Sequence, residues 1–287
     1  MGRLVAAILA GISAGASYGL IALGIVLVYK ATRVLNFAQA EIGTIALYVV
    51  WELNSIGVPA PIAVLLALAI AGAMGAGLEV LLRPLASAPR LTVTVATLGV
   101  GTALGYLELM LFTFNPRSSP DLFSGSAFSL AHVDFKWAHI AALVVTAALG
   151  IGLYLFFKRT LFGLGVMAVA QDQKALRLMG VPLNKVSAFT WATGAVLSAI
   201  AGIILAQLGP FNPFFMTLVL IPGLTAALVG GLTSLPGAFV GGIAVGIAEN
   251  IAKFSFGNTP GAEYVAEFAL LVVVLLLRPQ GLLGAEA

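Results

Sequence analysis

The residue types that usually carry covalent catalysis are scarce in this sequence. Cysteine is absent and the only histidines are His132 and His139, so disulfides, thiolate nucleophiles and cysteine metal sites are excluded. The segment from Gly11 to Gly15 reads Gly-Ile-Ser-Ala-Gly and matches the turn that presents a nucleophilic serine in some hydrolases. That turn needs a strand–turn–helix setting and a nearby histidine, whereas this one lies inside an apolar run, far along the chain from both histidines. We therefore interpret it as a helix-packing motif.

Motifs for nucleotides and metals are also missing. The sequence contains no G-x-x-x-x-G-K-[ST] phosphate loop, no H-E-x-x-H and no paired-aspartate metal motif, so we expect no ATPase site, no bound metal and no cofactor in this chain. The formal net charge is only +3 and the basic residues are scattered. This pattern gives no indication of nucleic-acid binding.

Acidic residues inside apolar stretches are the remaining candidates, because a buried carboxylate is costly and is often functional. Glu79 precedes Arg83 by four residues, and Glu249 precedes Lys253 by four. Since residues four apart face each other on a helix, we interpret both as local ion pairs.

Glu108 and the segment Asn36-Phe-Ala-Gln-Ala-Glu41 have no such simple partner. Glu108 could serve interhelical structure or line a pathway. Asn36, Gln39 and Glu41 form a polar group at a helix start, which could line a solute path, as broken helices do in transporters. The alternative is an interfacial helix cap, with Asn36 capping and Gln39 or Glu41 in the first turn.

The composition shows which kind of element must hold these side chains. Hydrophobic residues make up 61% of the chain and charged residues 9%, against roughly a quarter charged in a soluble domain. Leu4 to Tyr29 contains no acid or base and exceeds the roughly 20 residues that cross a bilayer. The fold class is therefore an all-α, polytopic membrane protein, with one domain over residues 1–287. Nine apolar stretches predict eight to ten helices: Leu4–Tyr29, Phe37–Leu53, Ala60–Leu82, Leu91–Phe114, Trp137–Phe157, Ser187–Gln207, Thr217–Leu232, Gly237–Ala252 and Glu263–Leu277.

Three of these stretches, the second, seventh and eighth, are short or interrupted and could be half-helices. Glycine pairs at four-residue spacing, such as Gly15/Gly19 and Gly242/Gly246, indicate close helix packing within one bundle.

Basic residues predict the orientation, because they are retained on the cytoplasmic side. With nine crossings and the N-terminus outside, ten lysines and arginines lie in inside segments and four in outside ones. Residues 158–186 then form a cytoplasmic loop. Residues 115–136 form an extracytoplasmic loop, which we expect to be a surface segment that could carry a short helix.

The cytoplasmic loop contains a predicted amphipathic helix over Val166–Met179. Apolar residues alternate there with Gln, Asp, Lys and Arg, and Gly180 and Pro182 supply a stop. Such a helix could lie on the lipid surface or in a groove of a partner protein.

The whole chain resembles the permease subunits of branched-chain amino acid ABC importers, the LivH/LivM type, and is closer to LivH. Five segments in the family's order carry the resemblance: Gly19–Glu41, Arg83–Gly99, Gly163–Gly180, Gly230–Gly242 and Leu277–Leu283. The chain departs from the family pattern at Gln39, Ala40 and Met167, where the family often has His, Gly and a basic residue.

The resemblance implies an ABC importer permease fold in the bacterial cytoplasmic (inner) membrane, translocating branched-chain or related amino acids by alternating access. The implied partners are a homologous second permease, two cytoplasmic ATPases that use ATP and Mg, an extracytoplasmic solute-binding protein and membrane lipid. The implied ATPase-contacting residues lie on the cytoplasmic loop: Val166, Ala170, Gln171, Asp172, Ala175 and Gly180.

The resemblance leaves the solute open, since relatives carry amino acids, urea, short amides or aromatic acids. A self-sufficient secondary transporter is a further alternative, with Glu108 as its only plausible coupling-ion site.

Overall fold

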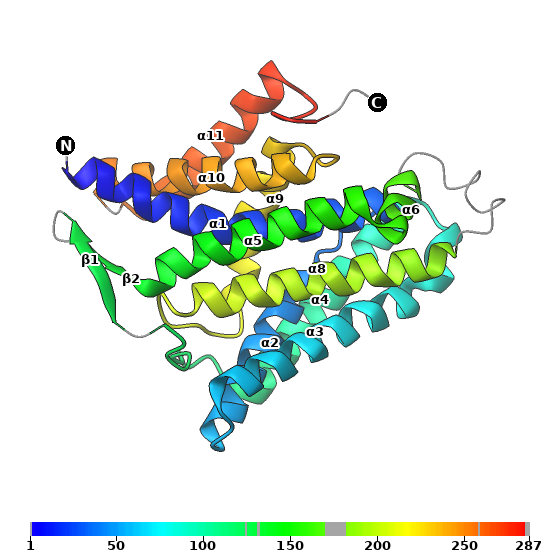
Figure 1. Cartoon of the computed structure of the whole chain (residues 1–287), viewed down its shortest axis with the longest axis horizontal. Coiled ribbons are helices and arrows are strands. Elements are labelled where there is room, and N and C mark those ends of the chain that lie inside the picture. The colour runs from blue at the N-terminus through cyan, green and yellow to red at the C-terminus, as the bar shows by residue number, and fades with distance from the viewer. Residues whose placement is uncertain (1, 124, 131–132, 170–181, 258, 285–287) are drawn as a thin grey trace.

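The protein is a bundle of long helices with one small hairpin at its end (Figure 1). The computed structural model describes residues 2–123, 125–130, 133–169, 182–257 and 259–284. The elements are α1 (Gly2–Thr32), α2 (Ala38–Ser55), α3 (Ala60–Leu82), the 3₁₀ helix η1 (Arg83–Ser87), α4 (Arg90–Phe112), β1 (Ser126–Leu130), β2 (Val133–Lys136), α5 (Trp137–Arg159), α6 (Leu161–Val169), α8 (Leu183–Leu205), α9 (Phe215–Gly230), α10 (Leu235–Ser255) and α11 (Ala262–Leu277). The prediction of an all-α membrane fold is confirmed.

The apolar α1 is the central helix, and its closest neighbour is α10. If Gly246 of α10 were replaced by alanine, the added Cβ would lie 2.3 Å from the Gly11 carbonyl oxygen. A Cβ added to Gly15 would lie 2.5 Å from the Gly242 carbonyl oxygen. The two backbones therefore touch, as small-residue helix pairs do in membranes. Ser13, between the two α1 glycines, is buried. The interpretation of Gly11–Gly15 as a packing motif is confirmed.

Six helices of the described chain are long and apolar enough to cross a membrane: α1, α3 continued through η1, α4, α5, α8 and α10. The helix α9 has only 16 residues with Pro222 inside it, and α2 has 18. The second and seventh apolar stretches of the sequence, Phe37–Leu53 and Thr217–Leu232, are thus short, as expected. The suggestion that the eighth is a half-helix is wrong, because α10 extends to 21 residues.

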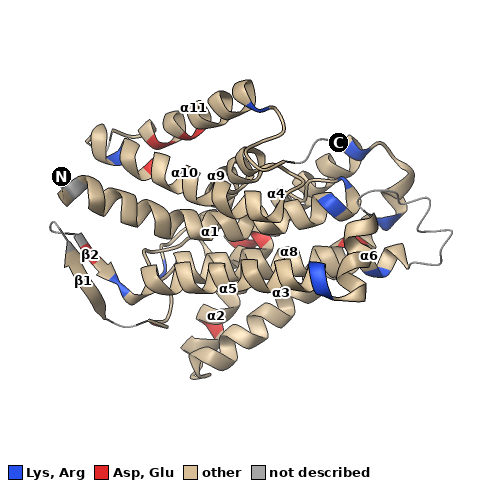
Figure 2. Cartoon of the chain, turned by 45° about the horizontal axis from the view of Figure 1, so that its top comes forward, with Lys and Arg blue, Asp and Glu red and all other residues tan. Residues whose placement is uncertain are grey.

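The basic residues gather at one end of the bundle, where α1, α3, α5 and α11 end and α4 and α8 begin (Figure 2). Arg117, Lys136 and Lys253 lie on segments at the opposite end. The positive-inside rule predicts that the first end is cytoplasmic, so we call the first end inner and the opposite end outer.

The outer segment 115–136 contains a hairpin where a helix was considered possible. Its strands β1 and β2 pair antiparallel, with Phe128 opposite Phe135, and these two rings stack 4.9 Å apart. Alternating aromatic and polar residues suit a strand with one covered face. Further back in the segment, Arg117 exchanges backbone hydrogen bonds with Phe211, which ties it to the α8–α9 connection.

At the inner end, the C-terminal segment folds back onto the α9–α10 turn. The amides of Leu282 and Leu283 donate to the carbonyls of Val229 and Gly230. Gly231 has φ +103°, a conformation that glycine adopts at little cost. Lys30 of α1 donates to the Thr233 carbonyl at 2.9 Å. The two segments Gly230–Gly242 and Leu277–Leu283, which carry part of the family resemblance and are distant in sequence, therefore form one structural unit.

Candidate translocation site

The connection between α1 and α2 lies among buried helices, since Asn36 has only 2% of its surface exposed. The Asn36 side-chain oxygen accepts a hydrogen bond from the Ala38 amide at 3.1 Å, while its Nδ2 has no partner among the described residues. The hydroxyl of Thr97 on α4 accepts from the Phe37 amide at 3.2 Å. Asn36 thus bonds to the first residue of α2, but it is not the N-cap, which is Phe37 without a side-chain cap, and its position is buried instead of interfacial.

The helix α4 buries only one stripe of side chains: Val93, Thr97, Gly101, Gly105 and Glu108. These positions recur every three or four residues and so form one face. The face packs on α2, where a Cβ on Gly101 would lie 3.2 Å from the Ala38 Cα. Most of the remaining surface of α4 is apolar and exposed, as a helix next to lipid or another subunit requires.

Glu41 and Glu108 come together at this α2–α4 contact. A Cβ on Gly105 would lie 3.5 Å from Glu41 Oε2, and Glu108 stands one turn further along the same face of α4, close enough to interact electrostatically with Glu41. The Thr217 hydroxyl at the start of α9 donates to Glu41 Oε1. Three helices therefore converge on two carboxyl groups.

These carboxyl groups have unused hydrogen-bonding capacity. Glu41 is 5% exposed and Glu108 1% exposed. Glu41 Oε2 and both Glu108 oxygens have no protein partner within the described parts of the chain. Buried polar atoms without partners are rare and costly, so this pair is the strongest candidate for contact with a polar solute, water or ion.

Aromatic side chains from α2, α4 and the α8–α9 connection pack together, and Tyr48 among them is close enough to Glu108 to interact electrostatically. The Tyr48 ring stacks on Phe112 with centroids 4.0 Å apart and meets Phe211 edge to face at 5.1 Å. Tyr48 is 1% exposed, and its hydroxyl has no hydrogen-bond partner in the described residues. Since Phe211 belongs to the α8–α9 connection, these ring contacts join that connection to α2 and α4.

Gln39 lies elsewhere, because two residues along a helix point in nearly opposite directions. It packs between Gly24 of α1 and Gly194 of α8, and its Nε2 donates to the Ile21 carbonyl at 3.3 Å. The structure therefore brings Glu41 and Glu108 together but separates Gln39 from them. The Oε1 atom of Gln39 has no hydrogen-bond partner among the described residues, and its place beside the solute path remains a prediction.

The two predicted local ion pairs are confirmed. The Glu79 carboxylate meets Arg83 at 2.5 Å, and the Glu249 carboxylate meets Lys253 at 2.5 Å.

Only part of the predicted cytoplasmic helix falls within the described residues. Helix α6 begins at Leu161, and its Val166 is 1% exposed and packs into this chain's own core. Val166 therefore anchors α6 and does not present its side chain to a partner. Ala170, Gln171, Asp172, Ala175 and Gly180 lie outside the described residues, so their role remains a prediction.

Sequence reasoning missed three polar residues that the structure makes prominent. Thr217 was included in an apolar stretch but not recognised as a partner of Glu41. Glu267 of α11 is 1% exposed and accepts a hydrogen bond from Thr225 of α9 at 2.6 Å. Glu267 stands in an apolar run, so the rule that singled out Glu108 would have found it. Nothing in the local sequence marks either threonine.

Comparison with known proteins decides the family. Residues 7–276 match the family described as the permease component of the branched-chain amino acid transport system. The chain belongs to this permease family.

The permease is 32% identical to the high-affinity branched-chain amino acid transport system permease protein BraD of Pseudomonas aeruginosa, over 96% of this chain and 94% of BraD. It is 31% identical to LivH of Escherichia coli, over 96% of this chain and 93% of LivH. A solved structure, PsaBC from Streptococcus pneumoniae in complex with Fab, covers 97% of the permease and 91% of its own chain, with 17% identity and a TM-score of 0.48.

Membership and architecture agree that the protein is a multi-pass membrane permease. As a component of a transport system it works with other components.

Proposed function

We propose that this permease imports branched-chain or related amino acids by alternating access. The observation that carries the proposal is the match to BraD and LivH over 96% of the chain, since both relatives are named for branched-chain amino acid transport. The match covers nearly the full length of the chain and so includes the segments that hold the acidic pair. The secondary-transporter alternative has no comparable support.

The proposed assembly contains a homologous second permease, two cytoplasmic ATPases and an extracytoplasmic solute-binding protein. The sequence has no phosphate loop, so hydrolysis of ATP with Mg must come from partner subunits. The binding protein would deliver solute at the outer end, where the segment 115–136 lies. The ATPases would act at the inner end through the loop 158–186.

Within this assembly, Glu41 and Glu108 line the path that an amino acid follows. An amino acid carries an ammonium group, which a carboxylate with unused acceptor capacity can bind. The two glutamates offer three such oxygens among the described residues. The neighbouring Gly105 leaves space against Glu41, and Thr217 fixes its orientation. The buried Asn36, with its unpartnered Nδ2, lies at the start of the same helix and could extend the path.

The test begins with purification of the permease in mild detergent and identification of the proteins that come with it. The complex is then reconstituted in liposomes, and uptake of labelled leucine, isoleucine and valine is measured with and without ATP. We expect uptake to require both ATP and the ATPase subunits. We also expect unlabelled branched-chain amino acids to compete with the labelled ones and lower their uptake.

Two results would overturn the proposal. Uptake that continues in liposomes without any ATPase subunit would indicate a secondary transporter. Uptake that is competed by urea, short amides or aromatic acids, but not by amino acids, would assign a different solute.

A further inference from the structure

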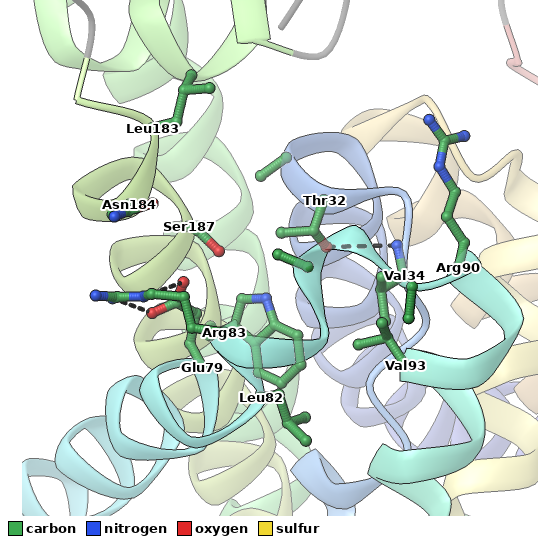
Figure 3. Close-up of a pocket in the computed structure, with 14 residues that line it drawn as sticks. Thr32, Val34, Glu79, Leu82, Arg83, Arg90, Val93, Leu183, Asn184 and Ser187 are labelled. Carbon is green, nitrogen blue, oxygen red and sulfur yellow. Dashed lines mark hydrogen bonds and ion pairs between the residues drawn. The ribbon is translucent and has the colours of Figure 1, made fainter. Parts of the chain in front are cut away.

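A pocket opens at the inner end of the bundle, away from the acidic pair. Its volume is about 320 Å³, within the range of small-ligand sites. The ends of α1 and α3, the helix η1 and the starts of α4 and α8 surround it (Figure 3). The proposed solute path does not use this pocket, although Leu183 and Asn184 of its lining belong to the loop 158–186.

The pocket carries a positive balance of charge. In Figure 3 the Glu79–Arg83 pair and Arg90 stand on opposite sides of it. Two hydrogen bonds from Arg83 neutralise the Glu79 carboxylate. Arg90 forms no ion pair with any residue that the structure describes. One uncompensated guanidinium therefore remains at the rim.

Two helix N-termini add to this field. Helices α4 and α8, of 23 residues each, begin at the pocket with Arg90 and Leu183, and neither has a side-chain cap. The amides of the first two residues of each helix have no acceptor among the described residues, whereas those of Thr92 and Lys185 already donate to the carbonyls of Pro89 and Pro182. The helix dipoles favour negative charge near the unpaired amides.

An independent observation points into the same pocket. Trp191 lines it, is 2% exposed, and its indole N–H has no partner among the described residues. An indole nitrogen can only donate a hydrogen bond. The buried donor therefore requires an acceptor, and a ligand in the pocket can supply one.

The remaining walls combine apolar side chains, such as Val34, Leu82 and Val93, with the polar Thr32, Asn184 and Ser187. Beside the pocket, Leu81 is 65% exposed and Leu91 73% exposed. A free inorganic anion gains nothing from the apolar side chains, whereas an amphiphile gains from both parts. Basic pockets between membrane helices on the cytoplasmic side are the known setting for anionic lipid headgroups.

We propose that this pocket, formed by Arg90, Trp191 and the first turns of α4 and α8, binds the phosphate-bearing headgroup of an anionic phospholipid of the inner leaflet. The phosphate accepts from Arg90 and from the uncapped amides. Headgroup oxygens reach the Trp191 indole N–H and the Ser187 hydroxyl. The site does not depend on which solute the permease carries.

The test uses the full chain in nanodiscs of phosphatidylcholine alone or mixed with phosphatidylglycerol. The sequence has three tryptophans, so the double variant Trp51→Phe/Trp137→Phe leaves Trp191 as the only tryptophan, which is excited at wavelengths where tyrosine does not absorb. We expect phosphatidylglycerol to change the Trp191 emission, and native mass spectrometry to detect phosphatidylglycerol retained on the unmodified chain.

Variants then separate this pocket from general attraction to the basic inner surface. Arg90→Gln should lower phosphatidylglycerol retention about fivefold, the effect expected for one arginine near an anionic lipid surface. Trp191→Phe should lower it as well. Arg278→Gln, at the same end but outside the pocket lining, is the matched control and should have little effect.

Three outcomes would overturn the proposal. One is an equal loss of lipid in Arg90→Gln and Arg278→Gln. Another is a Trp191 emission that is the same in both nanodiscs. The third is displacement of the lipid by sodium phosphate when sodium chloride of equal ionic strength does not displace it. That result would assign the site to a free anion. Each can occur while ATP-driven uptake is normal, so failure here is distinguishable from failure of the transport proposal.

Discussion

Glu41 and Glu108 owe their position to small neighbours as much as to their own chemistry. A larger side chain at Gly105 would occupy the space against Glu41 Oε2. The hydroxyl of Thr217 holds the other oxygen of the same carboxylate. A buried carboxyl pair maintained by such contacts, with acceptor atoms still unused, is expensive for a structural role alone.

Our first prediction concerns these two residues. Glu41→Gln and Glu108→Gln should each lower amino acid uptake by about tenfold or more, because hydrogen bonds to charged groups contribute roughly 1.5–3 kcal/mol. Membrane expression and association with the ATPases should be unchanged. Uptake into liposomes at equal protein density is the measurement, with Glu52→Gln, an exposed glutamate of the same helix, as control. Wild-type uptake by both variants would return the pair to a structural role.

The contact between α1 and α10 is the clearest case in which an element depends on glycine. Both backbones approach so closely that a Cβ on Gly246 would lie within 2.5 Å of the Gly11 carbonyl oxygen and the Gly15 amide nitrogen. Backbone atoms cannot move aside as the end of a flexible side chain can. The helices would have to separate along a contact that runs through the centre of the bundle.

We predict that Gly246→Ala destabilises the permease, with a cost of about 1–3 kcal/mol or more from overpacking. The matched control is Gly77→Ala on α3, where nothing lies within 4 Å of the added Cβ. That control should be neutral or slightly stabilising, because alanine is favoured over glycine in a helix by up to about 1 kcal/mol. Thermal unfolding in detergent compares the two, and equal melting temperatures would refute the packing argument.

A third prediction concerns the proposed coupling segment, and it rests on sequence and family membership. Ala170→Glu would place bulk and an unpaired charge in a partner's groove. Gly180→Asp would disturb the predicted helix stop at a cost of roughly 1 kcal/mol. Both variants should remain in the membrane but lose ATPase binding or uncouple hydrolysis from uptake. Ser87→Glu adds a carboxylate at the same inner end and serves as control.

The decisive comparison measures ATPase binding, stimulated hydrolysis and uptake in one preparation of each variant. Wild-type values of all three in both Ala170→Glu and Gly180→Asp would show that this loop does not transmit the force.

At the scale of the whole molecule, the distribution of charge sets the orientation. The starts and ends of helices that carry most of the lysines and arginines lie together at one end (Figure 2). Because basic residues near short loops are retained in the cytoplasm, the orientation of every helix follows from this single asymmetry.

We predict that Ser87 faces the cytoplasm and Ser118 the opposite side. Both are exposed, and the chain has no cysteine, so Ser87→Cys and Ser118→Cys each introduce one labelling site of nearly the same size. A membrane-impermeant maleimide added to intact cells should label position 118 alone. Labelling of position 87 under those conditions would reverse the orientation.

The sequence by itself determined the class of protein, the approximate limits of nine helices, and the ion pairs within a helix. It also determined the family, through segments spread over the whole chain. These features depend on composition and on residues at most a few positions apart, as in Glu79 and Arg83. Periodicity and hydropathy report such local relations directly.

Only the tertiary structure decided which polar residues belong together. Asn36, Gln39 and Glu41 looked like one group, but Gln39 packs between α1 and α8 while Glu41 joins Glu108 and Thr217 from helices that are 67 and 176 residues away in sequence. The same holds for the inner pocket, which is lined by both Arg90 and Trp191, although these residues are 101 positions apart in sequence. A helix repeats its facing direction every 3.6 residues, so sequence shows that a face exists, but only the packing of whole helices determines what that face meets.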